Sequence, residues 1–117
     1  MKRFVGQLFR YGGDYKDFIT DTYESAVIER AFLQDNIIRM SFKYQDSNTS
    51  VQINLKSDDN LLFIGSSKAI DEDGFSGKIK VRYYHNGKNA LLIGTWIEDG
   101  EIDTCVIELQ EVKEFKD

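Results

Sequence analysis

The sequence predicts an all-β domain, an antiparallel meander of about eight strands that closes into a small barrel or a strongly curved sheet. Three observations lead to this prediction. Short runs of alternating apolar and polar residues recur about every 10 to 12 residues. Clusters of Gly, Asn, Asp and Ser separate these runs. Aromatic residues make up 13% of the 117 residues, and aromatic side chains pack well on the pleated surface of a strand.

The first strand is expected over residues 4–11. Its faces carry Phe4, Gly6 and Leu8 on one side and Val5, Phe9 and Tyr11 on the other. The pattern of residues 15–33 is ambiguous, because Asp21 and Glu24 have the spacing of a helix cap whereas the end of this segment alternates as a strand does. We expect a short helix or irregular segment near 15–24 and a strand over about 26–33.

The middle of the chain alternates more clearly. Strands are expected over residues 37–44, 51–56 and 61–66, separated by turn-forming segments at 34–36, 46–48 and 57–60. In the segment 51–56 the polar residues fall wholly on one side, as they do in a strand with one buried face. The acidic segment 71–74 is expected to be a solvated loop.

The last three strands are joined by Asn86-Gly87 and Asp99-Gly100. Both dipeptides suit two-residue hairpin turns, because type I′ turns need positive φ at both central positions. This register pairs Tyr83 with Ala90 and Trp96 with Asp103. It also places Glu98 opposite Glu101, an unfavourable pair of like charges that a longer loop would relieve by shifting the third strand. The expected inward face is Ile79, Val81, Tyr83, Ala90, Leu92, Gly94, Trp96, Cys105, Ile107 and Leu109.

Composition limits the function classes. The length indicates a single domain over residues 1–117. The net charge of −5 argues against a general nucleic-acid binder, although Lys78, Lys80, Arg82 and Lys88 form a basic stripe around Tyr84. One cysteine excludes an internal disulfide and favours a reducing compartment. The N-terminal apolar run is too short for a signal core, and no stretch reaches a membrane span, so we expect a cytoplasmic protein with no membrane partner.

No pattern indicates catalysis. The chain has no metal-binding Cys/His cluster, no phosphate-cradling glycine motif and no evident nucleophile–base pair, so we expect no catalytic residue, metal or cofactor. The candidate ligand-binding residues are Tyr83, His85, Trp96 and Asp103, which lie on the inner face, where aromatic and carboxylate groups near a barrel mouth suit a small ligand. The alternative is that Trp96 is core and Asp103 a solvated rim residue.

The middle strand of this meander is apolar on both faces. Its outward residues Leu91 and Ile93, with Ile97 and Val106, are the candidate interface. Long Lys and Arg stems, or another part of the chain, are the alternative cover for these residues.

Two short segments resemble the calycin group of lipocalins, fatty-acid-binding proteins and avidins. Phe4-Val5-Gly6-Gln7-Leu8 is similar to the Phe-x-Gly-x-Trp start of fatty-acid-binding proteins, with Leu8 in place of the tryptophan. Residues 22–27 are similar to a strand of bacterial avidins, but the tryptophans that line a biotin site are missing and only Trp96 is present. The resemblance implies an up-and-down barrel with an interior pocket.

The sequence therefore predicts a non-catalytic module that binds a small ligand in or at the mouth of a β-barrel. The alternative is a protein-interaction module that binds no small ligand, either an inhibitor or immunity-type protein or a protein that self-associates as a homo-oligomer.

Overall fold

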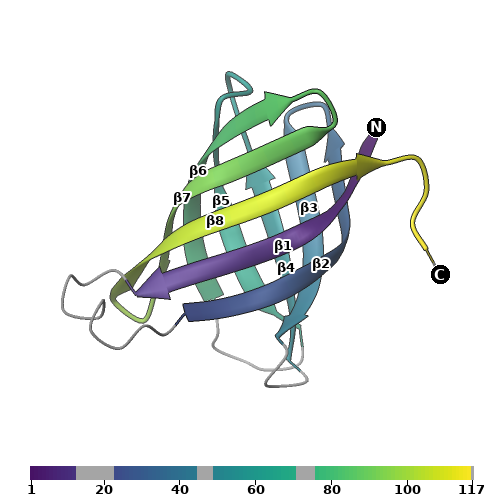
Figure 1. Cartoon of the computed structure of the whole chain (residues 1–117). Coiled ribbons are helices and arrows are strands. Elements are labelled where there is room, and N and C mark those ends of the chain that lie inside the picture. Colours follow the sequence, from purple (N-terminus) through teal and green to yellow (C-terminus); the bar gives the residue numbers. More distant parts are fainter. Residues whose placement is uncertain (13–22, 45–48, 71–75, 117) are drawn as a thin grey trace.

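The computed structural model describes residues 1–12, 23–44, 49–70 and 76–116, and in these residues it contains eight antiparallel strands and no helix (Figure 1). The strands are β1 (Lys2–Gly12), β2 (Tyr23–Gln34), β3 (Ile37–Tyr44), β4 (Ser50–Lys56), β5 (Leu62–Ala69), β6 (Ser76–Asn86), β7 (Asn89–Glu98) and β8 (Glu101–Val112). Each strand pairs with the next one along the chain. The predicted all-β meander is confirmed.

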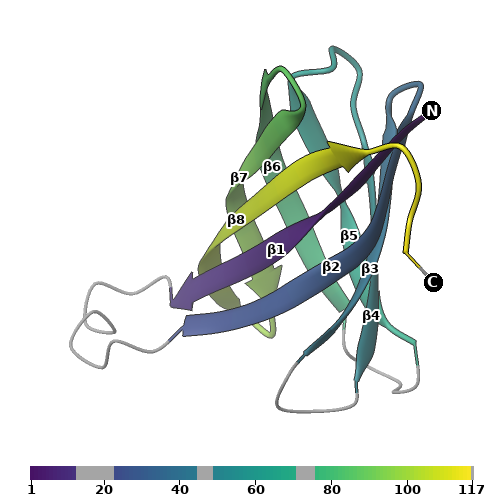
Figure 2. The same cartoon turned by 45° about the vertical axis from the view of Figure 1, so that its right-hand side comes forward.

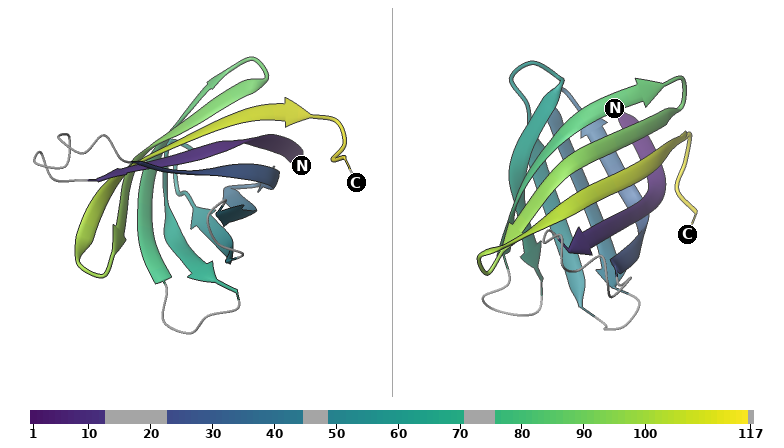
Figure 3. Two further views of the ribbon diagram at one scale, coloured as in Figure 1. Left: turned by 60° about the horizontal axis from the view of Figure 1, so that its bottom comes forward. Right: turned by 60° about the vertical axis from the view of Figure 1, so that its left-hand side comes forward.

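The barrel closes where the last strand pairs with the first. Strands β8 and β1 lie side by side in Figure 2, with Leu8 opposite Ile107 and Phe9 opposite Val106. Closure leaves no unpaired sheet edge, which removes a common route to aggregation. Figure 3 shows the strands winding obliquely around the barrel, with β6, β7 and β8 side by side along one wall.

The core fills the inside of the barrel, because alternate residues of every strand point inward. Leu8, Ile28, Ile53, Leu92 and Ile107 come from five different strands, and each is 0% exposed. A water-sized probe reaches none of these side chains, so the middle of the barrel is packed with protein atoms. The interior therefore has the character of a protein core.

The β7–β8 hairpin has the predicted register. Asp99 and Gly100 have φ values of 51° and 79°, as a type I′ turn requires. Trp96 lies opposite Asp103, and Glu98 opposite Glu101. The predicted pairing is therefore confirmed, including the pair of like charges.

The predicted β6–β7 register is wrong: the turn lies one residue further along the chain, so each residue of β6 pairs two residues further along β7. The turn residues are Gly87 and Lys88, and Tyr83 pairs with Leu92 instead of Ala90. Gly87 has a φ of 61°, which suits the first central position of a type II′ turn, where glycine is preferred. The predicted inward and outward faces survive, because Ala90 and Leu92 lie on the same face of β7.

The predicted start of the second strand is wrong, because β2 begins at Tyr23 and not near residue 26. Tyr23 and Glu24 therefore belong to a strand, whereas the rest of the predicted helix or irregular segment lies outside the described residues. The acidic segment 71–74 lies outside them as well. Irregular pairing of β1 with β2 between Phe4 and Gly6, and of β2 with β3 between Ile28 and Arg30, explains why the alternation of β2 is imperfect.

Candidate functional site

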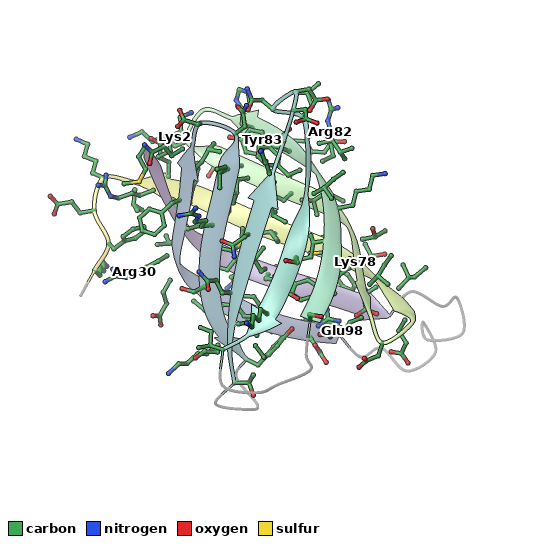
Figure 4. The ribbon with its side chains drawn as sticks, turned by 180° about the vertical axis from the view of Figure 1, so that it is seen from behind. Lys2, Arg30, Lys78, Arg82, Tyr83 and Glu98 are labelled. Atoms are coloured by element: carbon green, nitrogen blue, oxygen red, sulfur yellow. The ribbon has the colours of Figure 1, made fainter. Side chains whose placement is uncertain are left out.

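The four predicted ligand-binding residues fall into two separate pairs. On β6, Ile79 lies opposite Trp96, and Tyr83 is four residues further along, a distance of about 13 Å. Figure 4 shows Tyr83 near one end of the barrel and Glu98, which follows Trp96 on β7, near the other. Trp96 and Asp103 therefore lie at one mouth, and Tyr83 and His85 at the opposite end.

Arg10 is the centre of the mouth that holds Trp96 and Asp103. It is only 8% exposed, and its guanidinium carbon lies 4.3 Å from the centroid of the Trp96 ring. Nη2 donates to Asp103 Oδ2 at 2.7 Å and to Glu98 Oε2 at 3.3 Å. Nη1 donates to Tyr44 Oη at 2.8 Å and to Glu24 Oε2 at 3.5 Å. We call Arg10, Glu24, Tyr44, Trp96, Glu98 and Asp103 the mouth cluster.

The mouth cluster keeps Arg10 charged. Burial by itself would lower the pKa of the Arg10 guanidinium, but Tyr44 and Asp103 raise it above its ordinary value. Burial raises the pKa of the Tyr44 hydroxyl, and Arg10 partly opposes that shift. Glu98 forms an ion pair with Arg10, and this pairing offsets the repulsion from Glu101, which lies opposite Glu98 on β8. The cluster thus closes this end of the barrel with paired charges and supports the reading of Trp96 as core.

Two donors of the mouth cluster have no hydrogen-bond partner among the residues that the structure describes. They are Arg10 Nε and Trp96 Nε1. A Cβ at Gly77 would clash with the indole nitrogen of Trp96, so β6 passes very close to this ring. Buried donors of this kind are commonly met by an ordered water.

Tyr83 and His85 form an aromatic group at the opposite end. Their rings stack with centroids 5.7 Å apart, and Phe63 meets Tyr83 edge-on at 5.8 Å. Burial and nearby Glu111 raise the pKa of the Tyr83 hydroxyl. His85 is exposed, so this pair forms a half-buried cover over the core.

The cysteine thiol is buried, as the sequence predicted. Cys105 is 0% exposed, and burial raises its pKa to about 12. A thiol in this state is protonated at neutral pH and is a poor nucleophile. Within the described residues, no group of three His, Cys, Asp or Glu side chains is placed to hold a metal ion.

The predicted interface residues share one outer wall. Ile93 lies opposite Val106 with Leu91 and Ile97 on the same side of β7, and closure of the barrel extends this wall over β1 and β2. Phe9 lies beside Val106, and Tyr23 contacts Phe9 at 6.2 Å between ring centroids. We call the outward residues Phe9, Tyr11, Tyr23, Val27, Leu91, Ile93, Ile97, Ile102 and Val106 the apolar wall.

A hollow of about 480 Å³ lies on the outer face of β2, β3 and β4, beside the turn that joins β2 to β3. Its lining includes apolar Phe32 and Ile37, and polar Arg39, Ser41 and Gln52. Phe115 packs edge-on against Phe32 with 5.1 Å between ring centroids, so the C-terminal tail lies beside the hollow. We call this region the outer hollow.

The outer hollow was not predicted, because its lining comes from three strands and the chain start. Arg10 was also missed, although it continues the inward series Phe4, Leu8 on β1 and could have been found by extending that series.

Comparisons with protein-family models, with curated proteins and with solved structures found no match. Nor does the described part of the chain contain a helix long and apolar enough to cross a bilayer.

Proposed function

We propose that this protein is a non-catalytic binding module that takes a small anionic molecule with an apolar portion in the outer hollow. The observation that carries the proposal is the shape and lining of the hollow. A volume of about 480 Å³ lies within the range of small-molecule sites, and such sites combine apolar walls with a few directing polar groups.

The chemistry of the lining selects an anion. Arg39 supplies a guanidinium, which suits a carboxylate because it offers two parallel donors. Ser41 follows it on the same face of β3, and Gln52 lies opposite Ser41 on β4, so hydroxyl and amide donors adjoin the guanidinium. Phe32 and Ile37 offer apolar contact to the remainder of the ligand.

Benzoate, an aromatic carboxylate, tests this proposal in a titration followed by ¹H–¹⁵N NMR. We expect saturable shifts confined to β2, β3 and β4. Arg39→Gln should weaken binding at least tenfold, because a charge-assisted hydrogen bond contributes roughly 1.5–3 kcal/mol and each 1.4 kcal/mol is a factor of about ten. Lys43→Gln, on the same face of β3 but outside the lining, is the matched control and should leave the affinity unchanged. Shifts centred on Trp96 and Asp103, or equal effects of the two variants, would contradict the proposal.

The packed core is the reason for placing the proposed ligand outside the barrel. A calycin-type interior pocket needs empty space between the strands, and the interior side chains leave none in the middle of the barrel. The eight-stranded closed barrel is compatible with a calycin shape. Membership of that group and a cytoplasmic location stay predictions.

Self-association through the apolar wall is the second candidate function. Seven large apolar side chains of this wall are each at least 38% exposed: Tyr11, Tyr23, Val27, Leu91, Ile93, Ile97 and Ile102. Large contiguous apolar surfaces usually contact another molecule. Glu108 is the one charged side chain in the interior of this wall, between Leu91 and Gln7, so two copies can meet here without strong charge repulsion.

Sedimentation velocity over a range of protein concentrations tests the second candidate. We expect the sedimentation coefficient to rise with concentration and Ile93→Lys to abolish that rise. Ile64→Lys is the matched control, since Ile64 is 54% exposed but lies on β5, outside the apolar wall. A concentration-independent monomer would count against this function.

A further inference from the structure

All charged residues of strands β3 to β6 are positively charged. Together they contain seven lysines and arginines and no aspartate or glutamate. Every one of the seven is exposed, on the outer side of the barrel. We call these residues the basic wall: Arg39, Lys43, Lys56, Lys68, Lys78, Lys80 and Arg82. Figure 4 looks onto these strands and shows Lys78 and Arg82 along β6.

The basic wall has no internal counter-charge. Within the part of the chain that the structure describes, no ion pair includes a residue of the basic wall. The acidic residues of the described chain lie outside these four strands, with Asp35 in the turn before β3 and Asp58 and Asp59 in the turn between β4 and β5. Strand β8 contains Glu101, Asp103, Glu108 and Glu111 and no cation, and in the strand order of the barrel it lies across from β4.

This separation changes what the net charge of −5 implies. Charges interact through water over a Debye length of about 8 Å at physiological salt. The barrel measures 39 × 30 × 25 Å, so the carboxylates of β8 are screened from the basic wall. A polyanion at the wall would meet the local positive field rather than the charge of the whole chain.

The polar residues between the cations suit phosphates. Cross-strand rows place Asn54 and Ser66 between Arg39 and Lys78, and Gln52 beside Lys68. Lysine, arginine, serine, asparagine and glutamine are the side chains that contact phosphate oxygens in nucleic-acid complexes. Protein interfaces, in contrast, are depleted in lysine and enriched in aromatic residues, whereas five of the seven wall cations are lysines.

The curvature of the wall favours a flexible strand over a duplex. A duplex is stiff over about 150 base pairs and meets a convex barrel over only a few phosphates. A single strand can follow the curvature. Lys78, Lys80 and Arg82 form a row along β6, and at its end Tyr84 is 50% exposed with the Arg82 guanidinium 5.4 Å from its ring centroid. An exposed tyrosine of this kind offers a platform on which a base can stack.

We infer that the basic wall binds single-stranded nucleic acid through its phosphates, without reading its sequence. This inference is independent of the anionic ligand proposed for the outer hollow, although Arg39 belongs to both surfaces.

Fluorescence anisotropy with a labelled 20-nucleotide single-stranded RNA of mixed sequence tests the inference. We expect binding that weakens with salt, with a slope of log K against log salt that cannot exceed about −5 if all seven cations contact phosphates. The variant Lys78→Gln/Lys80→Gln/Arg82→Gln should bind at least tenfold more weakly. Its slope should be shallower by about 2, since each lost phosphate contact removes roughly 0.7.

A matched control removes the same charge elsewhere. Lys2→Gln/Lys113→Gln/Lys116→Gln changes three exposed cations outside the basic wall and should bind within about twofold of the wild type. The variant Lys78→Arg/Lys80→Arg should retain binding. Fluorescence of buried Trp96 checks that each variant is folded, and unchanged benzoate shifts in the wall variant separate this surface from the outer hollow.

Three results would overturn the inference. One is the absence of RNA binding by the wild type at 20 mM salt, or binding whose affinity does not change as salt is added. Another is an equal loss of affinity in the wall variant and the matched control. The third is displacement of the RNA by poly-glutamate of equal charge as readily as by unlabelled RNA, which would indicate an acidic protein partner instead.

Discussion

Arg10 shows how one residue reconciles charges that the strand pattern brings together. Alternation on β1 turns Arg10 inward, where an isolated guanidinium would be costly to bury. Asp103 and Glu98 approach it from β8 and β7, and the face of Trp96 covers it. The unfavourable pairing of Glu98 with Glu101 thereby becomes tolerable.

Replacing Arg10 should destabilise the barrel. Arg10→Leu leaves Asp103 and Glu98 without their cation and removes the contact with Trp96, so we expect a loss of about 3 kcal/mol in the free energy of unfolding. Urea denaturation followed by Trp96 fluorescence measures this loss. Arg3→Leu, an outward position on the same strand, is the control and should change stability by about 0.5 kcal/mol or less. Equal effects of the two variants would contradict a stabilising role for the mouth cluster.

Cys105 should be chemically inert in the folded protein. Its thiol is 0% exposed and its pKa is raised to about 12, so thiolate is scarce at pH 8 and a reagent has no access. We expect iodoacetamide to leave the native protein unmodified over hours and to alkylate it in 8 M urea, as mass spectrometry would show. Rapid alkylation of the native protein would mean that β8 opens readily or that the thiol is exposed.

At the scale of the elements, glycines mark where β6 and β7 come close or turn. Gly94 lies opposite Val81, and a Cβ at this position would clash with the carbonyl oxygen of Lys80. Gly87 occupies the turn with a φ of 61°, and nothing lies within 4 Å of a Cβ built there. The first glycine is needed for close approach and the second for its backbone conformation.

These two reasons predict different costs for alanine. Gly94→Ala should destabilise the protein by about 3 kcal/mol, because the backbone of β6 must move away. Gly87→Ala should cost about 1 kcal/mol, the price of a left-handed conformation for an L-residue. Thermal and urea unfolding of the two variants give the comparison. A larger loss for Gly87→Ala than for Gly94→Ala would show that the hairpin turn, and not the strand contact, limits stability.

At the scale of the whole molecule, burial of protonated groups makes the fold sensitive to alkali. The pKa of Cys105 rises from 9.0 to about 12, and that of Tyr44 is raised from 10.0. At a pH between the unfolded-state pKa and the folded-state pKa of these groups, the unfolded chain releases protons that the folded chain retains. Stability is therefore full below about pH 9 and falls as the pH rises toward 12.

Urea unfolding at pH 8, 10 and 11 checks this dependence. We expect the midpoint to fall between pH 8 and pH 11, and to fall less in Cys105→Ala, which lacks one of the titrating groups. A midpoint that is constant over this range would show that the thiol and the Tyr44 hydroxyl titrate alike in the folded and unfolded chain.

The whole molecule also separates its surfaces by chemistry. The apolar wall occupies β7, β8, β1 and β2, and the basic wall occupies β3 to β6. The apolar wall and the basic wall thus belong to distinct regions, and a variant of one serves as a control for the other. The outer hollow adjoins the basic wall and shares Arg39 with it.

Local pattern was sufficient for much of the fold. Alternation alone assigned inward and outward faces on β1, β3, β4 and β7, because successive side chains of a strand point to opposite sides. Asp99-Gly100 specified the register that sets Trp96 opposite Asp103, since both residues accept positive φ. Asn86-Gly87 led to a turn placed one residue too early. In the type II′ turn only the first central residue, Gly87, needs positive φ, and Lys88 takes the second central position.

The candidate sites depended on contacts that no local pattern encodes. Tyr83 and Trp96 share a face but lie at opposite ends, because the residue opposite Trp96 on β6 is Ile79, four residues before Tyr83. The outer hollow and Arg10's partners combine side chains from strands far apart in sequence.

A β-meander of about eight strands, the core-facing side of each clear strand and a buried Cys105 could all be predicted from local pattern. The closure of β8 on β1, the filled interior and the placement of the basic wall across from β8 became visible only in the folded barrel. These two groups of features differ in the range over which their causes act. Side-chain alternation and turn chemistry act over a few residues, whereas closure, packing and the separation of charge depend on which distant strands become neighbours.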